Sequence, residues 1–315
     1  MNPLIENLRR RAEIVKNIRR FFDALGFIEV RTPILSADSI VDRYVEPISV
    51  TDLSFPTNRH GTKTYYLQTS PEFAMKRLLA AGMTEIYQLT PVFRKGERGT
   101  MHNVEFTMLE WYRVGDDYRT GMGLLAEFVR SILGRTVERR SFRNVFMERT
   151  EIDPHRTNVR QLRSFVEERN IPFPDEPDDE SWIDLIFSEL VQSMPGATIV
   201  YDFPVFQSQL ARIRTENDGI AVAERFELFV DGVELANGYH EMLDAEELRQ
   251  RFCRIAEQRR LDGKPDIPVE SRLLAAMTAG LPACCGTALG LERLLMVKLG
   301  AASIDQVFPF PIEIA

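Results

Sequence analysis

Apolar and polar positions alternate with different periods along the chain, and each period predicts a type of element. Between residues 4 and 25 the apolar side chains recur at helical spacing, which predicts an amphipathic helix that ends at Gly26. Apolar positions alternate with polar ones over residues 87–93 and again over residues 104–112. Two such runs joined by a polar loop predict a long antiparallel hairpin.

The rest of the chain mixes the two periods and predicts a fold with both helices and strands. Further strands are expected at residues 27–30, 64–68, 198–203, 223–230, 233–236 and 286–290. Helices are expected at residues 71–81, 120–133, 159–169, 182–193, 245–261 and 291–299. This order of elements indicates the α+β class, with an antiparallel sheet flanked by helices.

Individual residues predict where some of these elements begin and end. Ser70 is a favourable N-cap, and Pro71 suits the first position of the helix that follows. Thr157 is expected to cap a later helix. Residues 231–232 (Asp-Gly) are typical of a hairpin turn, and residues 237–238 (Asn-Gly) are expected to end the next strand.

Composition places the chain among ordinary globular proteins, with 315 residues, 44% of them hydrophobic and 27% charged. No apolar run approaches the roughly 18 residues that predict a membrane span. The N-terminus, MNPLIENLRRR, lacks the apolar core of a secretion signal, so we expect a cytoplasmic protein. The three cysteines fit neither a disulfide framework nor a zinc spacing. The net charge of −8 argues against a dedicated nucleic-acid binder.

Polar side chains also fall on elements that should be buried. On the second hairpin strand, Phe106, Glu110 and Tyr112 share one face because side chains repeat every second residue. A buried Glu needs a partner, and an ion pair between Arg94 and Glu110 would be a purely structural explanation. Three further stretches carry similar polar groups: residues 69–72, 224–241 and 286–293.

Taken together, these stretches resemble the signature motifs of class II aminoacyl-tRNA synthetases. FRKGERGTMHNVEFTMLEWY (93–112) resembles the second motif, GTALGLER (286–293) the third, and FIEVRTP (27–33) the first, dimer-forming one. TSPE (69–72) and VELANGYHE (233–241) are similar to the lysyl-specific parts of the class. The resemblance implies the class II catalytic fold in a single domain, residues 1–315, with a helical insertion at about 135–195, and a homodimer.

The resemblance also implies ligands and the residues that bind them. ATP would contact Arg94, Glu97, His102, Asn103, Phe106, Glu227 and Arg293, of which Arg94 and Arg293 would be catalytic. Magnesium (Mg2+) would be bound by Glu227 and Glu234. A lysine-like amino acid would contact Glu72, Arg94, Glu110, Tyr112, Asn237, Glu241 and Ala288. Fixed cations suit the charge that develops on an α-phosphate under attack, and carboxylates suit magnesium and a substrate ammonium.

Three departures from lysyl-tRNA synthetase narrow the family. Because the first-motif helix begins near residue 4, no anticodon-binding domain is expected. Gly96 stands where that family has Glu, with Glu97 one step further on, and this leaves the adenine contact open. Ala288 replaces a glycine of the third motif. These marks resemble the elongation factor P lysyltransferase family, which activates (R)-β-lysine and passes it to a lysine of elongation factor P.

Two other functions stay open at this point. The chain could be a minimal lysyl adenylate-forming enzyme or tRNA aminoacylase, or a non-catalytic amino-acid sensor on a synthetase fold. A sensor could dispense with ATP contacts, whereas all the expected cationic and acidic positions are present in the chain. We therefore expect an ATP-dependent ligase whose partner is elongation factor P and for which tRNA is not the acceptor.

We predict that Ala288 biases the site toward (R)-β-lysine. Its methyl group narrows a floor that is bare glycine in the related synthetases, and one methylene-sized change is worth about 10–200-fold. In Ala288→Gly the preference for the β isomer should shrink as α-lysine improves, measured as kcat/KM for both isomers. An unchanged isomer ratio would show that the specificity lies elsewhere.

Overall fold

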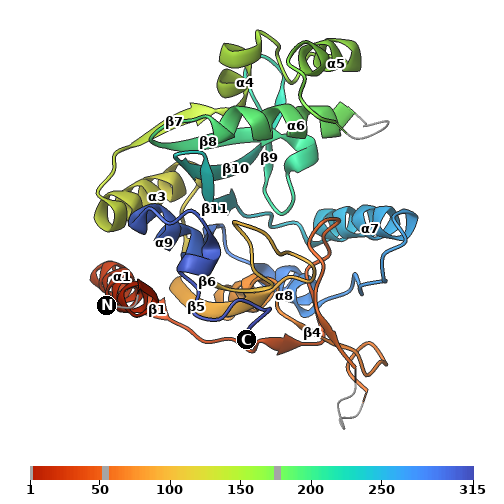
Figure 1. Ribbon diagram of the computed structural model, residues 1–315. Coiled ribbons are helices and arrows are strands. Elements are labelled where there is room, and N and C mark those ends of the chain that lie inside the picture. The colour runs from red at the N-terminus through yellow and green to blue at the C-terminus, as the bar shows by residue number, and fades with distance from the viewer. Residues whose placement is uncertain (1–2, 52–56, 174–178) are drawn as a thin grey trace. The chain divides into compact units, whose positions relative to one another are not determined.

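The computed structural model describes residues 3–51, 57–173 and 179–315 (Figure 1). The chain forms two compact units. Unit 1 comprises the described parts of Met1–Asp117 and Glu241–Ala315, and unit 2 is built from Tyr118–His240. Within the described ranges, no helix combines the length and the hydropathy needed to cross a membrane. The expected single domain with a helical insertion stays a prediction.

The sheet of unit 1 is organised around the hairpin that the sequence predicts. Its strands are β1 (Ile28–Glu29), β5 (Glu85–Phe93), β6 (Glu105–Val114) and β12 (Cys284–Gly290), in that spatial order. β5 and β6 are antiparallel, as are β6 and β12, whereas β1 runs parallel to β5. The register places both Gln88 and Ala288 opposite Glu110, so β6 lies between two strands with its polar face fixed.

Helices bury the faces of this sheet. In α1 (Pro3–Ala24), Phe22 stacks on Tyr87 with ring centroids 4.6 Å apart and contacts Trp111 at 5.4 Å. α9 (Leu291–Leu299) packs on β6, and α2 (Glu72–Ala80) packs on α8 (Arg272–Gly280), which also contacts α7 (Ala245–Leu261). A small second sheet has the order β2 (Leu35–Ser36), β4 (Tyr65–Leu67), β3 (Ser49–Val50).

Unit 2 contains its own sheet and its own core. The strand order is β11 (Val233–His240), β10 (Ala221–Val230), β8 (Ala197–Pro204), β7 (Val137–Ser141), and β9 (Ile213–Thr215) pairs with β10. The helices are α3 (Tyr118–Leu133), α4 (Phe142–Thr150), α5 (Val159–Glu168) and α6 (Asp179–Gln192). Phe142 lies at the centre of the core, with its ring centroid 4.3 Å from Phe187 and 5.2 Å from Phe203.

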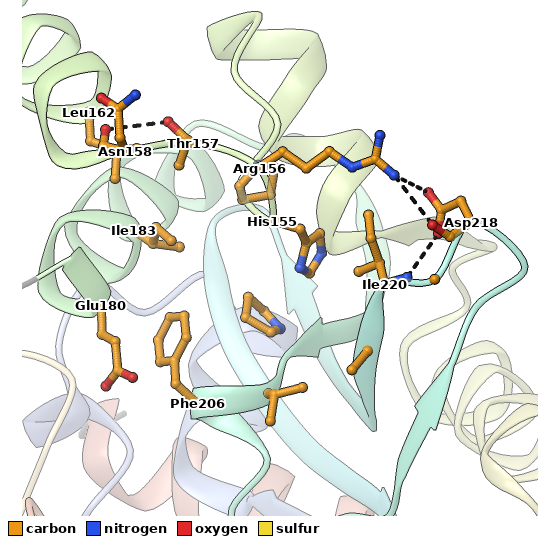
Figure 2. Close-up of a pocket in the computed structure, with 15 residues that line it drawn as sticks. His155, Arg156, Thr157, Asn158, Leu162, Glu180, Ile183, Phe206, Asp218 and Ile220 are labelled. Atoms are coloured by element: carbon orange, nitrogen blue, oxygen red, sulfur yellow. Dashed lines mark hydrogen bonds and ion pairs between the residues drawn. The ribbon is translucent and has the colours of Figure 1, made fainter.

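A cavity of about 580 Å³ opens beside the helices of unit 2 (Figure 2). His155, Phe206 and Ile220 are among its lining residues, and at one side Arg156 reaches Asp218 at 3.5 Å. None of the residues that the sequence analysis assigns to ATP, magnesium or the amino acid lines it. The candidate active site therefore lies on other parts of the chain.

Three local predictions are wrong. α2 begins at Glu72, because Pro71 has ψ near 1° and acts as the N-cap residue, while Ser70 lies outside the helix and accepts a hydrogen bond from the Glu72 N–H. Asn158, not Thr157, caps α5 by accepting from the Gln161 N–H at 3.2 Å.

The third correction concerns the expected end of a strand at residues 237–238. β11 continues to His240, since Asn237 and Gly238 pair with Glu227 and Phe226 of β10. Backbone pairing with a long neighbouring strand overrides the low strand propensity of Asn and Gly. The sequence analysis also missed β2, β3, β7, β9 and α8, most of which are two to five residues long.

The turn between β10 and β11 generates a stability prediction. Gly232 has φ +81°, and a Cβ atom there would lie 2.3 Å from the backbone oxygen of Gln192. Gly232→Ala should therefore add an overpacking cost of about 1–3 kcal/mol to a strain of about 1–3 kcal/mol for a non-glycine residue in this backbone region.

Gly219→Ala is the matched control, because Gly219 has φ +83° and open space within 4 Å. Chemical denaturation should rank the two variants with Gly232→Ala clearly less stable. Equal destabilisation would mean that the close approach of a Cβ atom at residue 232 to the end of α6 does not change the free energy of unfolding.

Candidate active site

Three buried carboxylates surround one buried ammonium in unit 1. Glu72 at the start of α2, Glu110 in the middle of β6 and Glu241 have exposed fractions of only 7%, 1% and 1%. Lys76, 2% exposed, lies one helical turn after Glu72 on the same face of α2. Its Nζ is 2.5 Å from Glu72 Oε1 and 2.5 Å from Glu241 Oε2. We call these four residues the acid cluster.

Glu110 is held by two hydroxyl groups. The Tyr112 hydroxyl donates to Glu110 Oε1 at 2.7 Å, which the shared face of β6 makes possible. The Ser70 hydroxyl donates to Glu110 Oε2 at 2.7 Å. Among the described residues, the ion pairs of Arg94 and those of the acid cluster have no residue in common. The purely structural Arg94–Glu110 ion pair considered in the sequence analysis is therefore not the contact that satisfies the Glu110 carboxylate.

The electrostatics of the acid cluster favour a ligand with two positive charges. Burial raises the pKa of Glu110 to about 7, and the nearby Glu72 carboxylate adds to the effect. Burial likewise raises the pKa of Glu241, against the opposing effect of Lys76. Burial alone would lower the pKa of Lys76, but Glu241 and Glu72 raise it above its ordinary value. Three carboxylates against one ammonium leave an excess of two negative charges when all are ionised.

Lys76 is a member of the acid cluster that the sequence analysis did not single out, and Ser70 was assigned only a capping role. A signal for Lys76 exists in the sequence, since Glu72 and Lys76 are four residues apart in a predicted helix and so share a face. A buried lysine that pairs with a predicted substrate-binding acid could have been proposed on that spacing.

The floor of the acid cluster is formed by β12. Gly286 pairs with Tyr112, and a Cβ atom on Gly286 would lie 2.2 Å from Tyr112 Cε1 and 2.5 Å from Glu241 Oε1. The absence of a side chain is therefore what lets the tyrosine ring and the carboxylate approach the strand. Ala288, the next residue on that face, pairs with Glu110 itself. The structure thus places Ala288 next to the carboxylates expected to bind the amino acid.

Arg94 directly follows β5, which ends at Phe93, and not all nitrogens of its guanidinium group have hydrogen-bond partners among the described residues. Its backbone N–H donates to the Val104 carbonyl at 2.9 Å, which closes the loop between the strands. The guanidinium carbon lies 5.1 Å from the centre of the Phe106 ring, and Nη1 is 3.6 Å from a carboxylate oxygen of Glu97. Its Nε is buried and has no hydrogen-bond partner among the described residues. Because buried donors are nearly always satisfied, this atom fits a phosphate or carboxylate ligand.

Two further expected ATP contacts, His102 and Asn103, lie in the loop between β5 and β6, and Arg293 lies on α9. His102 and Arg293 are in contact, with Arg293 Nη2 2.5 Å from His102 Nε2. Asn103 instead bonds to the chain itself: its Nδ2 donates to the Glu105 carbonyl at 2.8 Å, and its Oδ1 accepts from the Ile312 N–H at 3.3 Å. Its contact with ATP stays a prediction.

The two expected magnesium ligands, Glu227 and Glu234, lie in unit 2. Burial raises the pKa of Glu227, and Glu234 adds to that effect, although Arg225 donates a hydrogen bond to Glu227 and opposes it. Within the described residues no group of three or more metal-binding side chains gathers. Two carboxylates suit magnesium, which keeps waters and substrate phosphates as its other ligands. Asn237 pairs with Glu227 in the ladder and donates to the Tyr239 hydroxyl at 2.6 Å.

Comparison with known proteins identifies the class first. Residues 2–314 match the family of tRNA synthetases class II (D, K and N), and the chain belongs to this family. This confirms the expected fold class and the resemblance on which the site residues depend.

Individual relatives narrow the comparison. The chain is 41% identical over 313 residues to an elongation factor P–(R)-β-lysine ligase of Pasteurella multocida (strain Pm70), covering 98% of this chain and 96% of that protein. A ligase of the same name from Salmonella typhi is 41% identical over 316 residues, with the same coverage of both chains.

We predict that binding of a basic amino acid strengthens as Glu110 ionises. With a pKa of about 7, this carboxylate goes from mostly protonated at pH 6 to mostly ionised at pH 8. The KM for the amino acid in pyrophosphate exchange should fall roughly tenfold over that range, while the KM for ATP stays nearly constant. Glu110→Gln should bind the amino acid more weakly and show a flatter pH profile.

The same titration gives a stability signature of opposite direction. The pKa of Glu110 is raised above its ordinary value of 4.5, so the folded state holds the proton longer than the unfolded state does. The stability contribution is therefore full below pH 4.5 and is lost as the pH rises through about 7. Glu110→Gln should remove this slope. A wild-type KM that is independent of pH would contradict the assignment of Glu110 to the substrate.

Proposed function

We propose that this protein activates (R)-β-lysine with ATP and transfers it to a lysine side chain of elongation factor P. The observation that carries the proposal is the acid cluster, whose three buried carboxylates share a single internal ammonium. A diamino acid supplies the two missing positive charges. The names of the curated relatives point to the same substrate and acceptor.

The reaction has two steps. In the first, the amino-acid carboxylate attacks the α-phosphate of ATP, a phosphoanhydride bond breaks, and pyrophosphate leaves. Arg94 would bind both the carboxylate and the α-phosphate with its planar fork, and its unsatisfied Nε is a donor available for this contact. Arg293 and His102 would meet the far end of the triphosphate. Magnesium, held by Glu227 and Glu234, would neutralise phosphate charge when bound.

In the second step the acceptor amine attacks the carbonyl of the adenylate. An amide bond forms, the acyl–phosphate bond breaks, and AMP leaves with the electron pair of that bond while the amine loses a proton. The protein needs no metal or cofactor beyond those of the first step for this transfer, because the adenylate already carries a good leaving group.

Selectivity for a diamino acid follows from desolvation. Glu72 would accept the ammonium near the carboxylate, and Glu110, Tyr112 and Glu241 the distal one, with Asn237 as a further contact. A substrate without the distal ammonium would leave buried carboxylates unpaired, which costs about 1–3 kcal/mol or more. Ala288, which pairs with Glu110 in the ladder, would discriminate between the α and β isomers.

A homodimer that forms through residues 4–33 completes the proposal, because these residues resemble the dimer motif of the class. Sedimentation at micromolar concentration tests it. A cytoplasmic location also fits an enzyme whose acceptor is an elongation factor.

We predict that Arg94→Ala and Arg293→Ala each lose about 10²–10³-fold in pyrophosphate exchange, equivalent to about 3–4 kcal/mol, without unfolding. Arg254→Gln, at an exposed position on α7, is the control and should keep wild-type activity. Near wild-type exchange in either alanine variant would show that the ATP contacts are wrongly assigned.

The acceptor is identified in a separate reaction. Wild-type protein, ATP and labelled lysine isomers are incubated with both elongation factor P and bulk tRNA, and the product that carries the label is determined. Label on elongation factor P supports the proposal, label on tRNA supports an aminoacylase, and exchange without label on either leaves only an adenylate former. A protein that binds the amino acid but catalyses no exchange would be a sensor.

A further inference from the structure

A small cavity lies in unit 1 beside a different face of α2 from the one that carries Glu72 and Lys76. Its volume is about 200 Å³, and its walls come from the segment around β2, the segment around β4, the start of α2 and the start of α8. Phe73, Ala74 and Arg77 of α2 line the cavity, whereas Glu72 and Lys76 of the same helix belong to the acid cluster. The cavity is smaller than the roughly 300–1,000 Å³ of small-molecule sites, so it suits a single side chain or a group of similar size.

The exposed rim of this cavity is cationic. Arg59, Arg77 and Arg272 line it and are all exposed, so we call it the arginine-rimmed cavity. Of the lining residues that the structure describes, Asp38 is the one with an acidic side chain. The chain has a net charge of −8, whereas the three guanidinium groups make the rim of this cavity locally positive.

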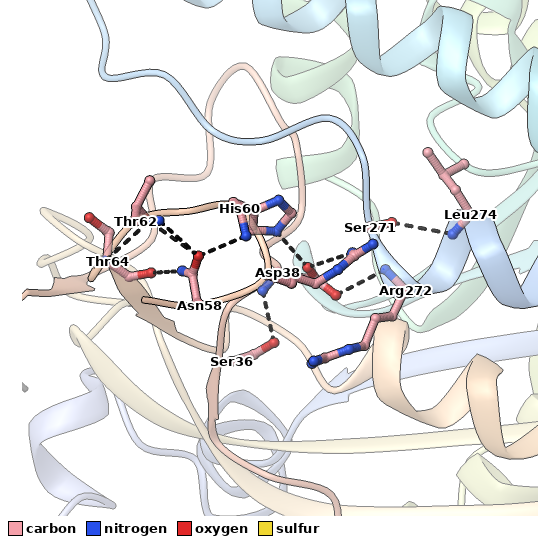
Figure 3. Close-up of polar contacts among 10 residues, drawn as sticks. Ser36, Asp38, Asn58, His60, Thr62, Thr64, Ser271, Arg272 and Leu274 are labelled. Carbon is pink, nitrogen blue, oxygen red and sulfur yellow. Dashed lines mark hydrogen bonds and ion pairs between the residues drawn. The ribbon is translucent and has the colours of Figure 1, made fainter. Parts of the chain in front are cut away.

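The charge of Asp38 is already matched. Its carboxylate accepts from Arg59 Nη1 at 3.2 Å, from the backbone N–H of Arg272 at 3.0 Å, and lies 2.9 Å from His60 Nε2 (Figure 3). These donors lower the pKa of Asp38 although burial opposes them. Among the described residues, no side-chain hydrogen bond or ion pair is found for the guanidinium groups of Arg77 and Arg272, and in Figure 3 the dashed line from Asp38 to Arg272 ends on the backbone nitrogen.

Two buried hydroxyl groups in the wall provide an independent indication of a ligand. Ser39 and Thr69 are 6% and 3% exposed, both line the cavity, and neither hydroxyl has a hydrogen-bond partner among the described residues. Buried hydroxyls are nearly always satisfied. Since a hydroxyl can donate one hydrogen bond, a ligand oxygen in this cavity could satisfy both while the rim neutralises its charge.

The cavity is adjacent to the candidate active site through one residue. Ser70 lines it and also donates to Glu110 of the acid cluster. A group bound here would therefore lie one residue away from the wall of the amino-acid site, without occupying the carboxylates that bind the amino acid.

We propose that the arginine-rimmed cavity binds an acidic side chain of the protein acceptor, and so positions the lysine that receives the amino acid. This inference rests on the proposed function. A carboxylate matches the size of the cavity, the two hydroxyl donors, and the two guanidinium groups that have no side-chain partner among the described residues. A nucleic-acid backbone would need an extended basic surface rather than one small cavity on an acidic protein.

The test separates transfer from activation. Arg77→Gln, Arg272→Gln and the double variant are compared with Arg254→Gln, which removes an exposed arginine of the same unit that does not line the cavity. In the double variant the KM for elongation factor P should rise about tenfold or more, as expected for the loss of charged contacts. Pyrophosphate exchange and the KM for the amino acid should stay at wild-type values in all four variants.

The partner side chain is found by a double-mutant cycle. Each Asp or Glu near the acceptor lysine of elongation factor P is changed to Asn or Gln and combined with the double arginine variant. Substitution of the acidic residue that occupies the cavity should raise the KM for elongation factor P with the wild-type enzyme. The same substitution should have little further effect with the double arginine variant. A scan in which no acidic residue shows this coupling would overturn the inference.

A hydroxyl variant distinguishes binding from a structural role. Ser39→Ala should leave the melting temperature unchanged or slightly raised, because the hydroxyl has no partner to lose, and should raise the KM for elongation factor P. A lowered melting temperature with an unchanged KM contradicts the inference.

Failure of the inference can be told apart from failure of the proposed function. A wild-type KM for elongation factor P in the double variant, or a parallel loss of pyrophosphate exchange, overturns the inference alone. If the wild-type enzyme transfers the label to tRNA instead of elongation factor P, the proposed function is overturned, and the inference with it.

Discussion

The candidate site depends on one buried ammonium, that of Lys76, which lies between Glu72 and Glu241. Removing a partner from such a buried ion pair typically costs about 3–5 kcal/mol, because a charge is left uncompensated. In the acid cluster the charges are not balanced, since Glu110 adds a third carboxylate to the single ammonium of Lys76. The same charges thus stabilise the start of α2 and leave the acid cluster with excess negative charge when all three carboxylates are ionised.

The strand ladder of unit 1 fixes where those charges lie. β6 presents Glu110 and Tyr112 on one face, and β12 places Gly286 and Ala288 directly opposite them. The missing side chain of Gly286 admits the tyrosine ring and the Glu241 carboxylate, which a methyl group would exclude. At the end of the neighbouring strand, the hairpin leaves a buried donor of Arg94 unsatisfied. Preorganised donors and charges of this kind need no rearrangement when a ligand arrives.

α2 separates two environments of opposite sign. Glu72 and Lys76 face the acid cluster, whereas Phe73 and Arg77 face the arginine-rimmed cavity. A nine-residue helix can do this because adjacent positions differ by about 100° around its axis. The preceding residue, Ser70, touches both environments.

The sequence by itself determined the hairpin, the fold class, and α7 and α9 to the residue, because these depend on periodicity and on recognisable motifs. It also singled out Glu72, Glu110 and Glu241, whose roles in substrate binding stay a prediction. It could not supply the continuation of β11 through Gly238, since that depends on pairing with a distant strand. Two-residue strands such as β2 have too few positions to show a period. Only the tertiary structure decided that Lys76 neutralises two of the predicted acids and that Ser39 lines a cavity with Arg272, because these contacts join segments far apart in the chain.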